Sequence, residues 1–141
     1  MTRTIFMDCV LEEAKEIYDL VLKNQLATLN EFADGVEIKH ISGKVEQSFE
    51  TKNQMLIHAL GHGVGLELHE RPFISSKNNS NLKENMVVTN EPGIYIAGKF
   101  GVRIEDTVLI TKNGCITLTN SEKNYTIIKG WKNKMQLASL T

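Results

Sequence analysis

The sequence predicts an α+β fold, in which two helices pack on one face of a curved, mostly antiparallel sheet. Two observations predict it. In the first part of the chain, apolar residues recur at three- and four-residue spacing, as they do along one face of a helix. After about Thr51, glycines become frequent and apolar residues alternate or come in short runs, as they do in strands. This change of period indicates helices layered on a sheet, with the other face of the sheet free for a site.

A strand and an amphipathic helix are expected at the start of the chain. Thr2 to Met7 is rich in β-branched and aromatic residues, which favour a strand. Asp8 has the side chain of a helix N-cap, so the first helix is predicted to begin directly after it. Its apolar face is predicted to consist of Val10, Leu11, Ala14, Ile17, Tyr18, Val21, Leu22 and Leu29.

A second, shorter helix is expected after a turn at Gly35. Ser42 is the predicted cap of this helix. Val45 and Phe49 lie four residues apart, which places both on one helical face.

The remainder is predicted to be mainly β. Residues 64–68 alternate between apolar and polar, Met86 to Thr89 is a short apolar run, and Val102 to Thr111 alternates without a break. The Asn113-Gly114 pair then predicts a hairpin turn into a strand from Cys115 to Leu118. The tail from Ser121, which contains Trp131, has no clear period and suggests no function.

Composition and charge limit the class of protein. At 141 residues the chain fits one compact domain and is short for two. The net charge of −1 offers no electrostatic reason to expect nucleic acid or an anionic membrane as a partner. There is no secretory leader at the start and no stretch approaching the ~18 apolar residues of a membrane span. We therefore expect a cytoplasmic protein in which Cys9 and Cys115 are reduced, buried thiols.

Three histidines, His58, His62 and His69, lie within one short segment. His58 and His62 have the spacing of two ligands on a zinc-binding helix, but the glycines at positions 61, 63 and 65 argue against a helix there. In an extended segment glycine instead permits bulges and close approach of the backbone to a ligand. Strict alternation puts His62 and His69 on opposite faces, so a shared site requires a bulge or turn between them. Taken singly, each histidine is more readily explained by a structural or surface role.

Two carboxylates, Glu91 and Glu105, stand in unusual contexts. Glu91 follows an apolar run and precedes Pro92, which places its carboxylate at a strand end. Glu105 lies within a strand, and Arg103 is its neighbour on the same face together with Thr107. A carboxylate buried in so apolar a strand must be paired or metal-bound. The alternative is an exposed face carrying an ordinary Arg-Glu pair, since most charged strand positions are solvated.

His62, Glu91 and Glu105 together predict a metal site. One imidazole and two carboxylates suit Mn, Co, Fe or Zn rather than copper. Two such metals sharing a carboxylate lower the pKa of a bound water and polarise a scissile carbonyl, which points to hydrolysis. The remaining histidines would then donate hydrogen bonds to the developing oxyanion.

Three motifs, in this order, resemble the pita-bread metallopeptidases of the Xaa-Pro aminopeptidase and Xaa-Pro dipeptidase (prolidase) type. They are HALGHGVGLELHERP at residues 58–72, NEPGIY at 90–95 and VRIEDTV at 102–108. The resemblance runs from Thr2 to about Leu118, and it implies the pita-bread fold. The pairing of His58 with Arg103 looks more like the proline-specific branch than like methionine aminopeptidases. Substrates would then be short peptides with proline in second position.

The resemblance also implies roles for individual residues. His62, Glu91 and Glu105 would be metal ligands, with Glu105 bridging two ions, Mn being the favoured metal. Glu91 would also serve as the proton-transferring base. His58 and His69 would be unligated histidines that contact the substrate and stabilise the tetrahedral intermediate, and Arg103 would complete the catalytic set.

The chain departs from the family pattern at its start. The family has two further ligands, both aspartates, and the second stands in an Asp-x-Thr-Arg-Thr motif of which Met1 to Thr4 matches only the end. Asp8 comes too late to replace it. We therefore expect residues 1–141 to be the carboxy-terminal part of a catalytic domain, to bind at most one ion weakly and to lack useful peptidase activity alone. The strand from Thr2 to Met7 would then have a free edge that invites self-association.

Two alternatives stay open at this point. The first alternative to a peptidase fragment is a non-catalytic pita-bread module that binds other proteins, and the second is a half-enzyme completed in trans by a separate amino-terminal piece. Retention of His58, His62, His69, Glu91, Arg103 and Glu105 favours the peptidase over the binding module, because a module selected only for binding has little reason to keep all six.

Overall fold

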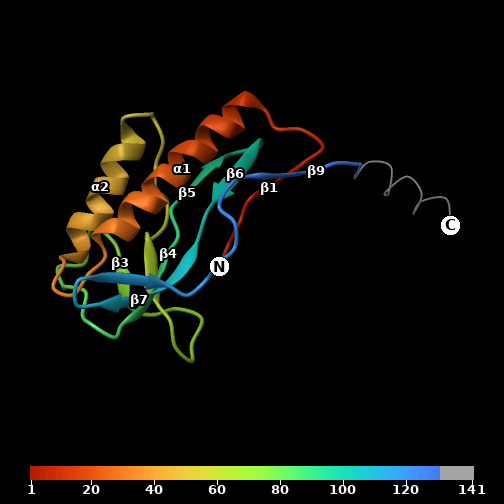
Figure 1. The fold of residues 1–141 in the computed structure, drawn as a ribbon. Coiled ribbons are helices and arrows are strands. Elements are labelled where there is room, and N and C mark those ends of the chain that lie inside the picture. The colour runs from red at the N-terminus through yellow and green to blue at the C-terminus, as the bar shows by residue number, and fades with distance from the viewer. Residues whose placement is uncertain (131–141) are drawn as a thin grey trace.

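The computed structural model describes residues 1–130, and its elements run from an N-terminal strand through two helices into a β-rich half (Figure 1). The helices are α1 (Glu12–Glu31) and α2 (Ile38–Glu50). The strands are β1 (Ile5–Met7), β2 (Gly61–Gly63), β3 (Glu70–Ile74), β4 (Val87–Asn90), β5 (Gly93–Ile96), β6 (Phe100–Arg103), β7 (Asp106–Thr111), β8 (Gly114–Thr117) and β9 (Thr126–Ile128).

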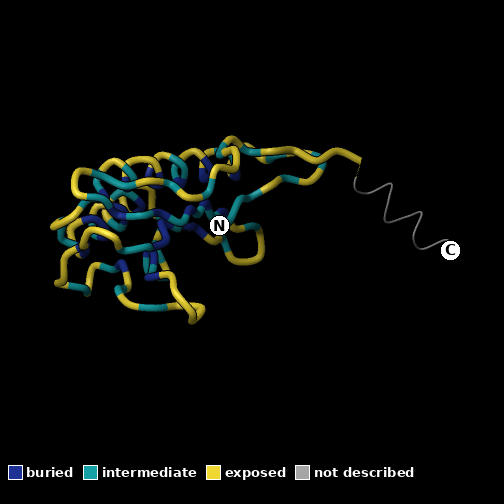
Figure 2. The backbone as a smooth tube through the Cα atoms, turned by 60° about the horizontal axis from the view of Figure 1, so that its bottom comes forward, coloured by how far each residue is buried: buried dark blue, intermediate teal, exposed yellow. Residues whose placement is uncertain are grey.

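The strands form one larger sheet and two ribbons. The larger sheet has the order β3-β2-β4-β7-β8, and each of its pairings is antiparallel. β5 and β6 form an antiparallel ribbon, and β1 pairs with β9 in parallel. α1 packs against α2 and against β4, β5, β6 and β8, so the helices cover one face of the sheet. Figure 2 shows the buried backbone where helices and strands meet, and exposed loops around it. The α+β prediction is confirmed.

α1 forms where the helical period is predicted, but it begins later than expected. Ala14, Ile17, Tyr18 and Val21 are buried on its inner face. The predicted N-cap is wrong, because Asp8 has a φ of 63° and its carboxylate instead accepts a hydrogen bond from the backbone N–H of Gly130 at 2.8 Å. The helix starts at Glu12, so the predicted Val10 and Leu11 precede it and Leu11 is 63% exposed.

α2 also differs from the prediction at its start. The turn at Gly35 is present, with a φ of +80° that suits glycine. The helix then begins at Ile38, so Ser42 is not its cap but a buried interior residue whose hydroxyl donates to Glu46. Val45 and Phe49 lie on the buried face, as predicted.

Residues 64–69 form a loop rather than the predicted alternating strand. The chain leaves β2 at Gly63 and re-enters the sheet only at β3, and a register irregularity lies within β2. Leu66 is 102% exposed and Leu68 is 83% exposed, so their alternation reflects no buried face.

The predicted strand from Val102 to Thr111 exists in two pieces, β6 and β7, joined by Ile104 and Glu105. The two ladders on either side keep one register, since Asn90 lies opposite Asp106 and Gly93 lies opposite Arg103. The ladder is interrupted at Pro92, which has no N–H to donate. β7 then turns into β8 as predicted, although the two turn residues are 112 and 113, one earlier than expected.

The start of the chain is tied to the rest at two places. Thr2 forms an isolated antiparallel bridge with Glu105, and β1 covers only Ile5–Met7 of the predicted strand.

Cys9 is exposed, contrary to prediction, whereas Cys115 is partly buried and burial raises the pKa of its thiol. Neither α1 nor α2 is both long and apolar enough to cross a membrane. Trp131 lies outside the described residues.

Candidate metal centre

Glu91 and Glu105 lie on the face of the sheet that the helices leave uncovered. Ile104, Asp106, Val108 and Ile110 are buried beneath the helices, and the residues between them are only half-buried. Directly opposed residues of an antiparallel pair share a face. Because the register is continuous from β4 to β6, Glu91 falls opposite Glu105 on this second face. The alternation read from the sequence is therefore confirmed.

His62 and Glu91 converge on this face. The Nε2 atom of His62 is 3.3 Å from Oε1 of Glu91, and each side chain is 13% exposed. The Thr89 hydroxyl donates to the same Oε1 atom at 2.9 Å. Glu91 follows the last residue of β4, as its position before Pro92 predicted.

The tautomer of His62 follows from its other ring nitrogen. Nδ1 is 2.9 Å from the carbonyl oxygen of Gly63, and a carbonyl can only accept, so Nδ1 carries the proton. In the neutral ring the lone pair of Nε2 then faces the carboxylate of Glu91. Two acceptors at this distance repel each other unless a proton or a metal cation lies between them.

Glycines permit the close approach of β2 to its neighbours. A Cβ at Gly61 would lie 2.0 Å from the carbonyl oxygen of Thr89, and a Cβ at Gly63 would lie 2.4 Å from that of Arg71. Real side chains do not tolerate such contacts with backbone atoms, so these positions require glycine. The prediction of an extended segment rather than a helix is confirmed at Gly61 and Gly63, where the close approach is to neighbouring strands.

Glu105 is held from the side by the start of the chain. The Thr2 hydroxyl donates to Glu105 Oε2, and the Met1 amino group lies 3.4 Å from Oε1. Arg103 does not pair with Glu105 directly. Its Nε donates to the Thr2 hydroxyl at 3.2 Å, so Thr2 links the guanidinium to the carboxylate. With a side chain 13% exposed, Glu105 is more enclosed than a solvated Arg-Glu pair would be.

His58 and His69 occupy opposite sides of His62 in the chain. The Nδ1–H of His58 donates to the carbonyl oxygen of Ala59 at 2.8 Å, and its Nε2 is 3.2 Å from the Tyr95 hydroxyl. The rings of His62 and His69 meet edge to face, with centroids 4.5 Å apart. The loop at residues 64–69 supplies the turn that a shared His62–His69 site requires.

The full triad is not assembled as a ligand cluster. Within residues 1–130, no three His, Cys, Asp or Glu side chains are grouped closely enough to hold a metal ion. His62 and Glu91 are in contact, while the Glu105 carboxylate is turned toward Thr2 and Met1. The donor types fit a divalent metal, but the described residues supply only part of its coordination shell.

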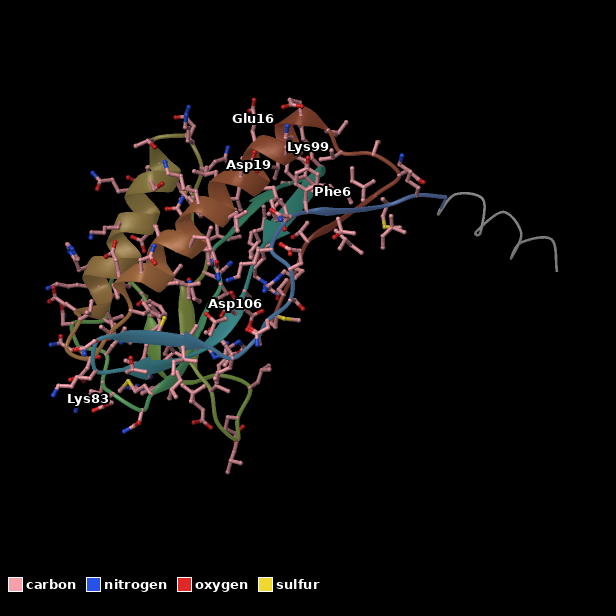
Figure 3. All side chains as sticks on the ribbon, viewed as in Figure 1. Phe6, Glu16, Asp19, Lys83, Lys99 and Asp106 are labelled. Atoms are coloured by element: carbon pink, nitrogen blue, oxygen red, sulfur yellow. The ribbon has the colours of Figure 1, made fainter. Side chains whose placement is uncertain are left out.

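Asp106 is a buried charge whose role the sequence pattern did not reveal. Arg3 and Thr119 contact its Oδ1 at 2.6 Å and 2.8 Å, and Gln25 and Lys123 contact its Oδ2 at 2.6 Å and 2.8 Å. Its side chain is fully buried, and Figure 3 labels it near the middle of the folded part. The sequence did hold one signal of this burial: Asp106 lies on the apolar face of β7, where it alternates with Ile104 and Val108.

Two cavities of the described residues lie apart from the paired His62 and Glu91. One, of about 290 Å³, has His58 in its wall together with Leu56 and Ser75. A larger one, of about 600 Å³, lies beside β3 and is lined by Arg71, Phe73 and neighbouring residues, with none of the predicted site residues in its wall.

Residues 1–112 match metallopeptidase family M24. The chain belongs to this family. A curated M24 relative, Xaa-Pro dipeptidase of Pyrococcus furiosus, is 45% identical over 125 residues, which are 87% of this chain and 36% of the relative.

Solved M24 structures show the same fold. The X-Pro aminopeptidase of Thermotoga maritima is 38% identical with a TM-score of 0.83, over 89% of this chain and 36% of that one. A recombinant prolidase of Thermococcus sibiricus is 36% identical with a TM-score of 0.86, over 89% of this chain and 35% of that one. The pita-bread fold and the resemblance to prolidases are thus confirmed. The chain spans about a third of the length of these relatives.

Proposed function

We propose that residues 1–141 are the carboxy-terminal portion of an M24 catalytic domain and contribute one side of a divalent-metal centre. His62, Glu91 and Glu105 are the proposed ligands. The observation that carries the proposal is the contact between Nε2 of His62 and Oε1 of Glu91 at 3.3 Å. This arrangement, with Nδ1 fixed by a backbone carbonyl, is the one that a metal-binding imidazole adopts.

Each proposed catalytic residue has a contact that suits its role. When bound, the metal supplies a water of lowered pKa and polarises the scissile carbonyl. Glu91 would serve as the base, because the Thr89 hydroxyl occupies only one of its two carboxylate oxygens. His58 exchanges a proton at Nε2, since its Nδ1–H is already used by Ala59. His69, whose ring packs on that of His62, and Arg103, whose Nε donates to the Thr2 hydroxyl, are the proposed substrate contacts.

The proposed reaction is hydrolysis of the bond before proline in Xaa-Pro dipeptides or at the amino terminus of Xaa-Pro peptides. The relatives named Xaa-Pro dipeptidase and X-Pro aminopeptidase support this substrate class. Mn is the proposed metal, because one imidazole and two carboxylates form a ligand set on the hard side of borderline. A cytoplasmic location is proposed as well, since Cys9 and Cys115 are both free thiols.

Calorimetry with MnCl₂ tests the metal site. The 141-residue chain is expected to bind at most one ion weakly, because only two of the three proposed ligands, His62 and Glu91, are in contact within residues 1–130. His62→Ala should abolish this binding. His40→Ala is the matched control, since His40 is an exposed histidine on α2 and its loss should leave binding unchanged. Two tightly bound ions, or equal binding by His62→Ala, would contradict the proposal.

Activity assays separate the proposed function from the two alternatives. The chain alone is expected to show no useful cleavage of an Xaa-Pro dipeptide with Mn²⁺ present. Hydrolysis that appears only after a separately produced amino-terminal piece is added would identify a half-enzyme completed in trans. Robust cleavage by the chain alone would contradict the expected inactivity. A chain that binds no Mn²⁺ in any combination would favour the protein-binding module.

A further inference from the structure

Thr89 lies at the centre of the contact between His62 and Glu91. It is a residue of β4, its exposed fraction is 3%, and its hydroxyl touches both partners. The backbone N–H of His62 donates to Thr89 Oγ1 at 2.9 Å, and Thr89 Oγ1 donates to Glu91 Oε1 at 2.9 Å. With the 3.3 Å contact between Glu91 and the His62 ring, these bonds close a loop from the His62 backbone back to its own imidazole.

The direction of these hydrogen bonds is fixed by chemistry. A hydroxyl has one proton to donate, and a backbone N–H can only donate. Because Thr89 accepts from His62, its single proton is free for the carboxylate of Glu91. A carboxylate that accepts a hydrogen bond from a buried hydroxyl is held in one orientation, and the bond is stronger than one between neutral groups.

The surrounding backbone leaves the Thr89 side chain little freedom. Gly61 brings β2 so close to β4 that an added Cβ would lie 3.1 Å from Thr89 Oγ1. A β-branched side chain in a strand is also restricted about its first torsion angle. The hydroxyl is therefore presented to Glu91 by the backbone of two strands and does not need a metal to find its place.

We propose that Thr89 is a positioning residue that sets the orientation of Glu91 relative to His62 before any metal binds. The expected effect of Thr89 on metal affinity rests on the proposed function. The hydrogen-bonded loop does not, because it is present in the chain without a metal. Outer partners of this kind typically contribute 10–100-fold to the metal affinity of the ligands that they orient.

The loop is tested first without metal, by amide hydrogen exchange of the 141-residue chain. Thr89→Val keeps the shape of the side chain but removes the acceptor of the His62 N–H, so that amide should exchange about tenfold faster. Thr89→Ser restores the hydroxyl and should restore slow exchange. The amides of Leu60 and Glu91, which bond to backbone carbonyls, are internal references and should not change. Unchanged exchange at His62 in Thr89→Val would overturn the proposal.

Mn²⁺ titration of the same variants tests the second part. Affinity should fall by about 10–100-fold in Thr89→Val and recover in Thr89→Ser. If the parent chain binds no Mn²⁺, the proposed function fails, while hydrogen exchange still decides whether the loop exists. Equal affinity in Thr89→Val and the parent would overturn the positioning role.

Thr107→Val is the matched control. Thr107 lies opposite Thr89 in the ladder and on the same face, and within residues 1–130 its hydroxyl makes no recorded hydrogen bond. Its substitution should change neither His62 exchange nor Mn²⁺ affinity. If Thr89→Val does not fold, Thr89→Ala removes the same hydroxyl with a smaller side chain and carries the same expectations.

Discussion

At the residue scale, Asp106 and Gly61 carry constraints that determine how the candidate site is held. Burial of the Asp106 carboxyl would raise its pKa, but hydrogen bonds from Lys123, Arg3 and Thr119 outweigh burial and hold the pKa below its ordinary value. Because Gly61 has no side chain, β2 can approach the Thr89 carbonyl. Asp106 stabilises the buried face of the sheet, and Gly61 shapes the face that carries the candidate site.

The lowered pKa of Asp106 predicts that the folded chain loses stability in acid. Because its pKa is lower in the folded chain, its contribution is fully present above the unfolded pKa of about 4 and is lost as pH falls through the folded pKa. At neutral pH, Asp106→Asn should cost about 3–5 kcal/mol, since it leaves Arg3 and Lys123 facing an uncharged group. Urea unfolding at several pH values checks this. The difference between the two proteins should shrink with acidity, and a constant difference would contradict the assignment.

Gly61→Ala is predicted to be strongly destabilising. Its methyl group would overlap backbone atoms of Thr89, which cannot move without disturbing β4, so we expect a loss of about 2–4 kcal/mol. Thermal unfolding measures the effect. Gly114→Ala is the control, because nothing lies within 4 Å of the added Cβ at Gly114. A cost at Gly61 no greater than at Gly114 would show that β2 does not approach β4 this closely.

At the element scale, the two-stranded ribbon of β1 and β9 is the least covered part of the sheet structure. Its ladder is parallel, with Phe6 opposite Ile127, and it carries exposed apolar side chains such as Ile5 at 50% and Ile128 at 40%. Phe6 also packs with Tyr18 and Tyr125, which anchors one side of the ribbon to α1. The other edge of β1 has no paired strand among residues 1–130, as predicted for this segment.

Self-association through β1 stays a prediction. An apolar strand edge is a template for pairing with another chain, so light scattering should show mass rising with concentration. Ile5→Lys should suppress this rise, because a charge on the edge strand opposes pairing. Leu26→Lys, on the exposed side of α1, should not. A parent chain that stays monomeric at every concentration would rule the association out.

At the scale of the whole molecule, Arg3 joins segments that are far apart in sequence. Its five N–H groups all find acceptors, on the backbone of Thr2, Glu105, Ser121 and Glu122 and on the carboxylate of Asp106. A planar guanidinium can make this set of bonds and an ammonium cannot. The start of the chain, β7 and the segment after β8 are thereby held as one unit.

Arg3→Lys is therefore predicted to loosen the molecule despite keeping the charge. We expect a loss of about 2–3 kcal/mol in the free energy of unfolding, with faster amide exchange in residues 121–128. Arg71→Lys, at an exposed position, is the control and should stay within about 0.5 kcal/mol of the parent. If Arg3→Lys and Arg71→Lys change the free energy of unfolding equally, the hydrogen bonds of Arg3 do not hold these segments together.

Periodicity predicted the parts of the fold that face the core, and its errors lie where local and tertiary forces compete. Ile17 and Val21 on α1, and the alternation around Glu105, are as expected because burial imposes the period of each element. The predicted start of α1 was wrong because the Asp8 carboxylate accepts a hydrogen bond from Gly130, far along the chain, and does not cap the helix. Alternation at residues 64–68 was misleading because the side chains of Leu66 and Leu68 are exposed.

The sequence alone determined the family and the α+β class and predicted candidate site residues, because motifs and periods are local properties of the chain. The tertiary structure alone decided how those residues meet. It brought His62 to Glu91, placed Thr89 between them, turned Glu105 toward Thr2 and buried Asp106 among Arg3 and Lys123. These contacts join residues from separate elements, and the register and close approach of the strands, which no local pattern encodes, determine which of them form.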